Sequence, residues 1–141
     1  MNYLLDTCVI SEGVRPRPDR LVSAWQASIP QEKQYLSVLT LGEIQKGIAR
    51  LTDVTRARRL KQWLDVDVRG RFAGRVLPLD EETLLAWGDI AGAAEKRGTP
   101  LPVADGLLAA TALVHHLTFV TRDSADFAAT GIEVLDPWKK A

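Results

Sequence analysis

Four acidic residues occupy positions where an alternating strand–helix chain places a polar site. Asp6 ends the first apolar segment of the chain, and Asp123 follows a later one. Glu43 lies one turn into the helix expected after a second strand, and Asp105 lies in the first turn of a later helix. Because the carboxyl ends of parallel strands meet at one edge of a sheet, we expect these carboxylates to gather there.

Each of the four also has a purely structural explanation. Asp105 would be favoured at a helix start by the helix dipole, and Asp123 could cap the segment that follows it. Asp6 could begin a turn, and Glu43 could be an ordinary exposed helix residue. Position alone therefore does not decide between a site and four separate structural roles.

The apolar surroundings of Asp6 and Asp105 favour a shared acidic site over separate structural roles. Asp6 follows two leucines, Asp105 lies among apolar residues, and neither has a basic neighbour in the sequence. Partly buried carboxylates need compensation, since unpaired buried charge is destabilising. Oxygen ligands suit Mg²⁺ or Mn²⁺, and the lack of a Cys/His cluster argues against zinc. Such an ion could orient and deprotonate a water and stabilise charge on a phosphoryl group.

Hydrophobic patterning predicts the elements that would carry these residues. Alternation of short apolar strands with amphipathic helices is typical of an α/β fold with a mostly parallel sheet. The length of 141 residues fits a single domain over 1–141. The expected strands are 2–5, 34–37, 76–79, 118–121 and 133–135, and the expected helices are 19–29, 38–51, 53–68, 80–98 and 102–116.

Composition sets limits on the setting. The lone cysteine, Cys8, has no intrachain disulfide partner, which fits a reducing cytoplasm. No apolar run is long enough to span a membrane, and the apolar start of the chain lacks the basic region of a signal peptide. We therefore expect a cytoplasmic protein with no membrane association.

The net charge is zero, with 18 basic and 18 acidic residues, but the charges are unevenly distributed. Residues 46–75 hold nine Lys or Arg against three Asp. For the basic cluster in this segment, contact with a nucleic acid backbone, contact with a protein partner and simple solvation all stay open. The four tryptophans could stack on bases or pack in the core. The basic cluster comprises Arg56, Arg58, Arg59 and Lys61, and the tryptophans are Trp25, Trp63, Trp87 and Trp138.

An ordered set of short motifs resembles PIN-domain ribonucleases of the VapC type, the toxins of type II toxin–antitoxin pairs, and especially their FitB-like branch. The set covers nearly the whole chain, and its order makes it far more specific than an Asp-Thr pair alone. The matching segments are LDTCVISE at 5–12, YLS at 35–37 leading to Glu43, RFAGRVLP at 71–78, ADG at 104–106 with AATA at 109–112, TRD at 121–123 and PW at 137–138.

The resemblance implies a three-layer α/β/α PIN-like domain with a central sheet of four to five strands. It also implies that Asp6, Glu43, Asp105 and Asp123 form an acidic site that holds Mg²⁺ or Mn²⁺ and hydrolyses RNA phosphodiester bonds. Asp6 and Asp105 would be the principal metal ligands. Thr7 and Thr121 are possible outer residues that orient a carboxylate or a water, although a β-branched residue at a strand end is an equally good explanation.

The same resemblance implies partners. A small VapB-like antitoxin would cover the acidic site, with an Arg or Lys facing the carboxylates, and operator DNA would be bound only through that antitoxin. A homodimer and an RNA substrate are also implied, without indicating whether tRNA, rRNA or mRNA is cut.

One position departs from the family pattern. Cys8 stands where the family commonly has Asn, and a thiol is a weaker hydrogen-bonding group than an amide. This departure leaves open a catalytically weak or inactive PIN-like module that binds RNA or an antitoxin. The acidic strand end separately leaves open a phosphatase or phospho-receiver, although Cys8 counts against one class of these enzymes. A haloacid-dehalogenase nucleophile would require a second Asp at position 8.

Overall fold

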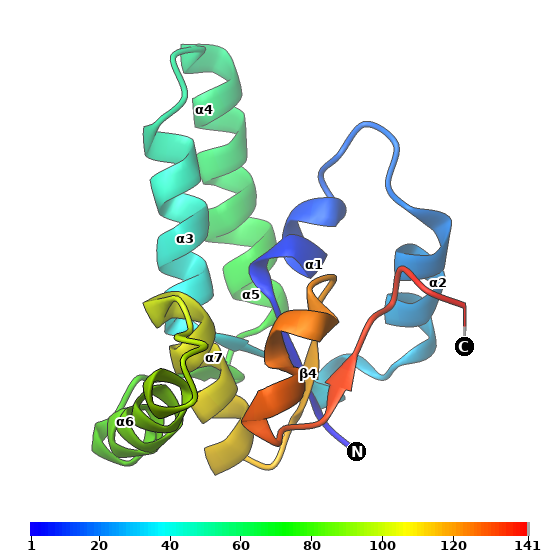
Figure 1. Cartoon of the computed structure of the whole chain (residues 1–141). Coiled ribbons are helices and arrows are strands. Elements are labelled where there is room, and N and C mark those ends of the chain that lie inside the picture. Colours follow the sequence, from blue (N-terminus) through cyan, green and yellow to red (C-terminus); the bar gives the residue numbers. More distant parts are fainter. Residues whose placement is uncertain (141) are drawn as a thin grey trace.

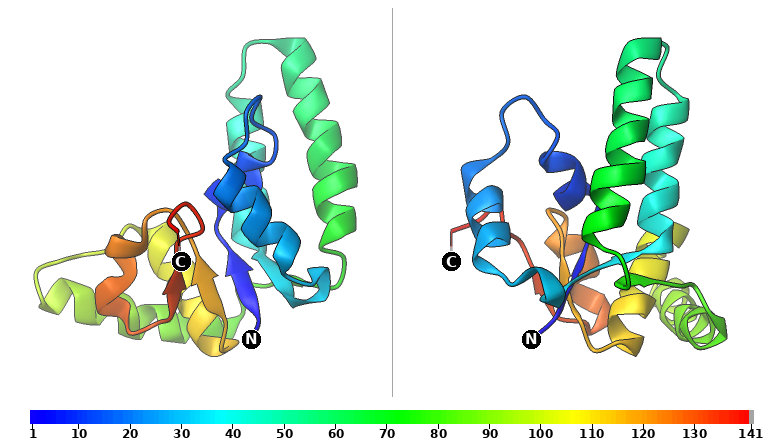
Figure 2. Two further views of the ribbon diagram at one scale, coloured as in Figure 1. Left: turned by 90° about the vertical axis from the view of Figure 1, so that its right-hand side faces the viewer. Right: turned by 180° about the vertical axis from the view of Figure 1, so that it is seen from behind.

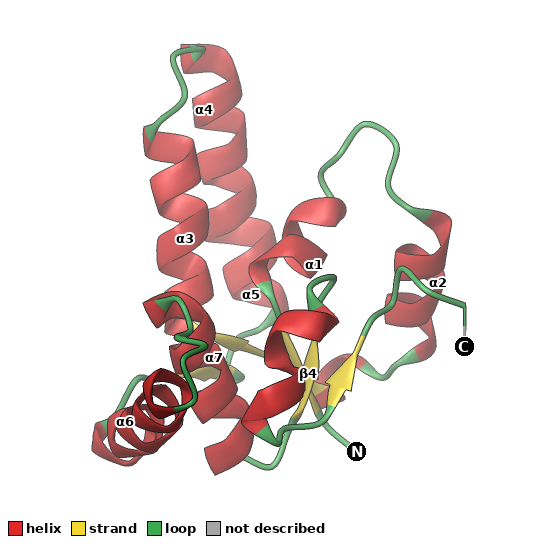
Figure 3. Cartoon of the chain, viewed as in Figure 1, coloured by secondary structure: helices red, strands yellow, loops and turns green. Residues whose placement is uncertain are grey.

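The computed structural model describes residues 1–140 and is built around a five-stranded sheet in the order β3-β2-β1-β4-β5. Every pairing between neighbouring strands is parallel, with Leu4 of the central strand opposite Tyr35 on one side and Phe119 on the other. Figure 3 shows this sheet in yellow between helices. The strands are β1 (Tyr3–Leu5), β2 (Gln34–Ser37), β3 (Val76–Leu77), β4 (Thr118–Val120) and β5 (Val134–Leu135).

Helices surround the sheet and are joined by short loops (Figure 1). They are α1 (Thr7–Glu12), α2 (Arg20–Ser28), α3 (Val38–Ala49), α4 (Val54–Gln62), α5 (Arg69–Arg71), α6 (Glu81–Lys96) and α7 (Val103–Val114). A π-helical segment, Trp63–Val68, joins α4 to α5, and 3-10 turns lie at Gln31–Lys33 and Ser124–Thr130.

Two hydrophobic cores form because successive strand residues point to opposite faces of the sheet. Leu5 and Val120 belong to the core shared with α1, α2 and α3, whereas Leu4 and Phe119 belong to the core beneath α7. Figure 2 shows α6 and α7 on one side of the sheet and α2, α3 and α4 on the other. The predicted three-layer α/β/α architecture is confirmed, with five strands.

Most helix starts follow the expected capping chemistry. Asp19, Asp53 and Asp80 each accept a hydrogen bond from a backbone N–H in the first turn of α2, α4 and α6. Gly98, just beyond α6, has a φ of 79°, as expected for a glycine that ends a helix.

Other boundaries differ from the predictions for physical reasons. The helix α1 was not predicted, because six residues are too few for a clear amphipathic pattern. The helix expected over 53–68 continues through the π-helical segment to Arg71. Pro102 lies at the N-cap of α7 with an extended backbone rather than within the first turn.

No described helix is both long and apolar enough to cross a membrane. The single-domain prediction covers 1–141, and its last residue lies outside the described range.

A close approach between α6 and α7 yields a stability prediction. A Cβ added at Gly106 would lie 2.9 Å from both Cδ1 and Nε1 of Trp87. We expect Gly106→Ala to lower the free energy of unfolding by about 1–3 kcal/mol, as overpacking typically does. Urea denaturation followed by circular dichroism measures the change.

Gly92→Ala on α6 is the matched control, because nothing lies within 4 Å of the added Cβ. It should leave stability unchanged or raise it by up to about 1 kcal/mol. Equal losses in both variants would contradict the proposed packing constraint.

Candidate acidic site

Asp6 joins the end of β1 to the start of α1. Its backbone N–H donates to Val120 O on β4 at 2.9 Å. Its carboxylate accepts from the N–H of Thr7 at 2.7 Å and from the hydroxyl of Thr121 at 2.7 Å. Two strands and one helix therefore fix this side chain at the carboxyl edge of the sheet.

Thr121 connects Asp6 to Asp123. Its fully buried hydroxyl donates to Asp6 Oδ2 and accepts from the backbone N–H of Asp123 at 3.1 Å. One hydroxyl thus links the carboxylate of Asp6 to the backbone of Asp123 on neighbouring strand ends. The sequence suggested Thr121 as an outer residue that orients a carboxylate; its hydroxyl does contact Asp6, and its role in a functional site stays a prediction.

Thr7 connects Asp6 to Glu43 in a similar way. Its hydroxyl donates to Glu43 Oε1 at 2.7 Å and lies 3.3 Å from the hydroxyl of Thr40, while its N–H donates to Asp6. Glu43 is placed by α3, whose start is capped by Ser37 at the end of β2. The helix that follows β2 thereby brings a carboxylate to the same edge of the sheet.

Asp105 reaches the cluster from the first turn of α7. Burial raises the pKa of its carboxyl above the ordinary 3.8, and nearby carboxylates raise that pKa further. The contributing carboxylates are those of Asp6, Asp126, Asp123 and Glu43. The structure thus brings Asp105 within electrostatic range of the other three predicted residues.

Burial is also the main reason that the pKa of Asp6 is raised. The hydrogen bonds from Thr121 and Thr7 oppose this increase, whereas the negative charge of Glu43 adds to it. An ionised Asp6 is therefore only partly compensated by neutral donors.

Asp126 was missed as a member of the cluster. It lies in the 3-10 turn after β4 and contributes to the raised pKa of Asp105. Its position after Asp123 was visible in the sequence, but the turn that brings it within electrostatic range of Asp105 carries no distinctive pattern.

The described residues provide no basic partner for the acidic cluster. The ion pairs within residues 1–140 involve Glu12, Asp65 and Asp136, and none involves the four predicted carboxylates. Across the same residues, no three His, Cys, Asp or Glu side chains are grouped so that they could hold a metal ion. The carboxylates repel one another without forming a closed protein cage.

This arrangement nevertheless fits a hard divalent ion. Mg²⁺ keeps several waters and is typically bound by one or two carboxylates together with substrate phosphate, so a closed cage is not needed. The available donors near the cluster are carboxylate and hydroxyl oxygens, which are the types that Mg²⁺ and Mn²⁺ prefer.

Cys8 lies beside Asp6 but is poorly suited to nucleophilic chemistry. Its Sγ is 3.7 Å from Asp6 Oδ2 and 4.0 Å from the hydroxyl of Thr121. Burial and the charge of Asp6 raise the pKa of the thiol to about 11, so the thiol is neutral near pH 7.

Comparison with known proteins identifies the family. The PIN domain model matches residues 3–133. The chain belongs to the PIN-domain family. Toxin FitB of Neisseria gonorrhoeae is 41% identical over 135 residues, which cover 96% of this chain and 97% of that protein. The VapC ribonuclease Y4jK of Sinorhizobium fredii is 37% identical over 138 residues, covering 98% and 99% respectively.

Solved structures agree with this assignment. This PIN domain superposes on the structure of FitAB bound to the IR36 DNA fragment with a TM-score of 0.93 and 38% identity, covering 99% of this chain and 97% of that one. The resemblance to VapC-type and FitB-like proteins is therefore confirmed.

The raised pKa of Asp105 predicts that this PIN domain is more stable without that charge. A raised folded-state pKa means that folding favours the protonated carboxyl, so the contribution of Asp105 to stability declines as pH rises from 3.8 through the raised value. At neutral pH in chelator, Asp105→Asn should raise the melting temperature, and added salt should reduce the gain.

Asp89→Asn, at an exposed carboxylate of α6, is the control and should leave the melting temperature nearly unchanged. The Asp105→Asn gain should also disappear at a pH well below 3.8, where both proteins are neutral at this position. A lower melting temperature for Asp105→Asn at neutral pH would show that Asp105 is compensated.

Proposed function

We propose that this chain is the toxin of a VapBC/FitAB-type toxin–antitoxin pair and a metal-dependent endoribonuclease. The observation that carries the proposal is the cluster of mutually repelling carboxylates without a basic partner, in a PIN domain 41% identical to Toxin FitB. VapC ribonuclease Y4jK supports the choice of RNA as substrate, since it matches over nearly the whole length of both chains.

Asp6 and Asp105 would be the principal ligands of the metal, with Glu43 and Asp123 acting directly or through water. The bound Mg²⁺ or Mn²⁺ would supply an activated water and stabilise charge on the scissile phosphoryl group. The protein's own contribution would be orientation, since the hydroxyls of Thr7 and Thr121 donate hydrogen bonds to Glu43 and Asp6. Such positioning accounts for much of the catalysis in phosphoryl-transfer sites.

A VapB-like antitoxin is the proposed protein partner. A cation from that antitoxin placed among the carboxylates would replace the metal's charge and relieve the same repulsion. Binding of operator DNA through the antitoxin is supported by the FitAB structure, which contains a DNA fragment. Homodimer formation and a cytoplasmic location remain predictions from the family resemblance and the lone cysteine.

The second candidate function is a non-catalytic PIN-like module that binds RNA or an antitoxin. The observation that favours it is Cys8, whose thiol makes only a long contact with Asp6 where the family commonly has an amide. Calorimetric titration with Mn²⁺ separates the two functions, since a module with a decayed site would bind no metal.

Loss of one carboxylate tests the nuclease proposal. Asp6→Asn keeps an oxygen for the Thr7 N–H but removes the negative charge, so we expect RNA cleavage in Mg²⁺ to fall by about a hundredfold or more. Growth arrest on expression should disappear as well. Cleavage of total RNA, with and without chelator, provides the measurement.

Asp89→Asn should cleave RNA at the wild-type rate and controls for the loss of a carboxylate elsewhere. Cleavage by Asp6→Asn that equals wild type, or cleavage that persists in chelator, would rule out the proposed chemistry.

A neutral thiol predicts that Cys8 is dispensable for the chemistry. Cys8→Ser should lose less than about tenfold in cleavage rate, whereas removing the nucleophile of a covalent hydrolase costs about 10⁶-fold. Single-turnover cleavage under reducing conditions measures the rate. A loss of several orders of magnitude would instead indicate covalent catalysis by the thiol.

A further inference from the structure

A groove of about 840 Å³ begins at the acidic site and runs between α1, α3 and α4. Thr7, Cys8 and Glu43 line the end at the site. A smaller hollow of about 420 Å³ continues from it and shares Glu12, Arg15, Pro16, Arg122 and Trp138 with the groove. A polymeric substrate whose reacting bond lies at the carboxylates would extend into the groove and the adjoining hollow.

Arginines dominate the charged lining of the groove. Arg15, Arg56, Arg59 and Arg122 face it, against the carboxylates of Glu12 and Glu43. Within residues 1–140, Arg15 pairs with Glu12, whereas the other three arginines make no ion pair. Unpaired guanidinium groups beside an acidic centre are suited to a phosphate-rich chain, which could not otherwise approach the carboxylates.

The arginines of α4 differ in whether their side chains face the groove. Arg56 and Arg59 are three residues apart on one helix face and line the groove, whereas Arg58 between them does not. Lys61 points elsewhere, since its ammonium donates to Gln45 at 2.7 Å and to Asp65 at 3.0 Å. The basic cluster seen in the sequence therefore divides into groove residues and solvent residues.

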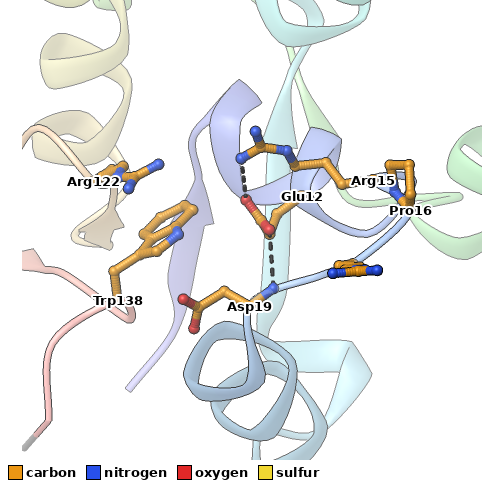
Figure 4. Close-up of a pocket in the computed structure, with 7 residues that line it drawn as sticks. Glu12, Arg15, Pro16, Asp19, Arg122 and Trp138 are labelled. Carbon is orange, nitrogen blue, oxygen red and sulfur yellow. Dashed lines mark hydrogen bonds and ion pairs between the residues drawn. The ribbon is translucent and has the colours of Figure 1, made fainter.

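Arg122 is placed by its neighbours. It lies between Thr121 and Asp123, both tied to the acidic site, and its guanidinium carbon is 5.3 Å from the centre of the Trp138 ring. Figure 4 shows this pair facing Glu12 across the pocket. A cation–π contact of this kind restrains the arginine over the groove.

Hydrogen bonds also hold the side of the groove opposite Arg122 and Trp138. Glu12 is 5% exposed and accepts hydrogen bonds from Arg15 Nη1 at 3.2 Å and from the N–H of Asp19 at 2.9 Å (Figure 4). This buried carboxylate anchors both ends of the loop over 13–18. The groove wall is therefore preorganised rather than formed only when a ligand arrives.

We propose that this groove binds the phosphate backbone of the RNA strand adjoining the cleaved bond, with Arg56, Arg59 and Arg122 as phosphate contacts and Trp138 as the positioning residue of Arg122. The proposal rests on the ribonuclease function proposed above. The apolar floor, which includes Ile44, Ile48 and Leu60, would also accept a peptide, so antitoxin binding is the competing outcome.

The test is RNA binding without catalysis. The full chain is titrated into fluorescein-labelled single-stranded oligouridine in chelator, and fluorescence anisotropy is recorded over a range of salt concentrations. Arg56→Ala/Arg59→Ala and Arg122→Ala should each bind about tenfold or more weakly. The slope of log K against log salt should become shallower by about 0.7 for each RNA phosphate that the variant no longer neutralises.

Arg58→Ala is the control, because it removes an arginine from the same helix but not from the groove, one charge where the double variant removes two. Its affinity and slope should stay near wild type. Melting temperatures of all variants check folding. Equal effects of Arg58→Ala and Arg56→Ala/Arg59→Ala would overturn the proposal by showing unspecific attraction.

Trp138 is tested through Arg122. Trp138→Leu should weaken binding, Trp138→Phe should restore it, and Trp138→Leu combined with Arg122→Ala should bind no worse than Arg122→Ala alone. Additive losses would contradict a positioning role.

Three further outcomes separate this inference from the nuclease proposal. Metal-dependent cleavage with unchanged RNA binding in the arginine variants would overturn the groove assignment alone. If those variants instead lost only copurification of a coexpressed antitoxin, the groove would be a protein interface and the inference would be wrong. Failure of the wild-type chain to cleave any RNA in Mg²⁺ would count against the nuclease proposal itself.

Discussion

Repulsion between carboxylates held at one edge of a parallel sheet is the constraint on which the site depends. β1, β2 and β4 end there, and α7 begins there, so chain geometry delivers Asp6, Glu43, Asp123 and Asp105 to one region. Neutral hydroxyls and amides hold two of these side chains in place but provide no positive charge. The folded chain therefore carries an unfavourable interaction that a bound cation would relieve.

Close packing around the acidic site allows the fold to tolerate repulsion between the carboxylates. The sheet is covered on both faces by separate hydrophobic cores, and each of β1 and β4 contributes residues to both. Close packing of α7 against Trp87 at Gly106 fixes the turn that carries the adjacent Asp105. Local destabilisation at functional sites is typically offset by such packing elsewhere in the fold.

Much of the fold and the main acidic residues could be predicted from the sequence. Alternating apolar segments located all five strands, and the rule that parallel strands end at one edge identified Asp6 and Asp123 as neighbours. The same rule led us to expect Glu43 and Asp105 at that edge, and the family resemblance added the metal-binding role of the four residues. The sequence could not show that Asp126 lies near the cluster, because its placement depends on a short 3-10 turn without a sequence signature.

The orientation of the α4 side chains could not be predicted either. Arg56, Arg58 and Arg59 are identical as residue types, and only the packed position of α4 shows which of them line the groove.

The π-helical segment affects which surfaces receive the basic side chains of residues 46–75. A π turn holds more residues than an α turn, so side chains beyond Val68 are rotated away from the stripe that α4 began. Arg71 accordingly lies over the Phe72 ring, donates to Gln34 and lines a separate hollow instead of the groove. A widened helical turn thus divides one cationic run between two surfaces, leaving each free to change without altering the other.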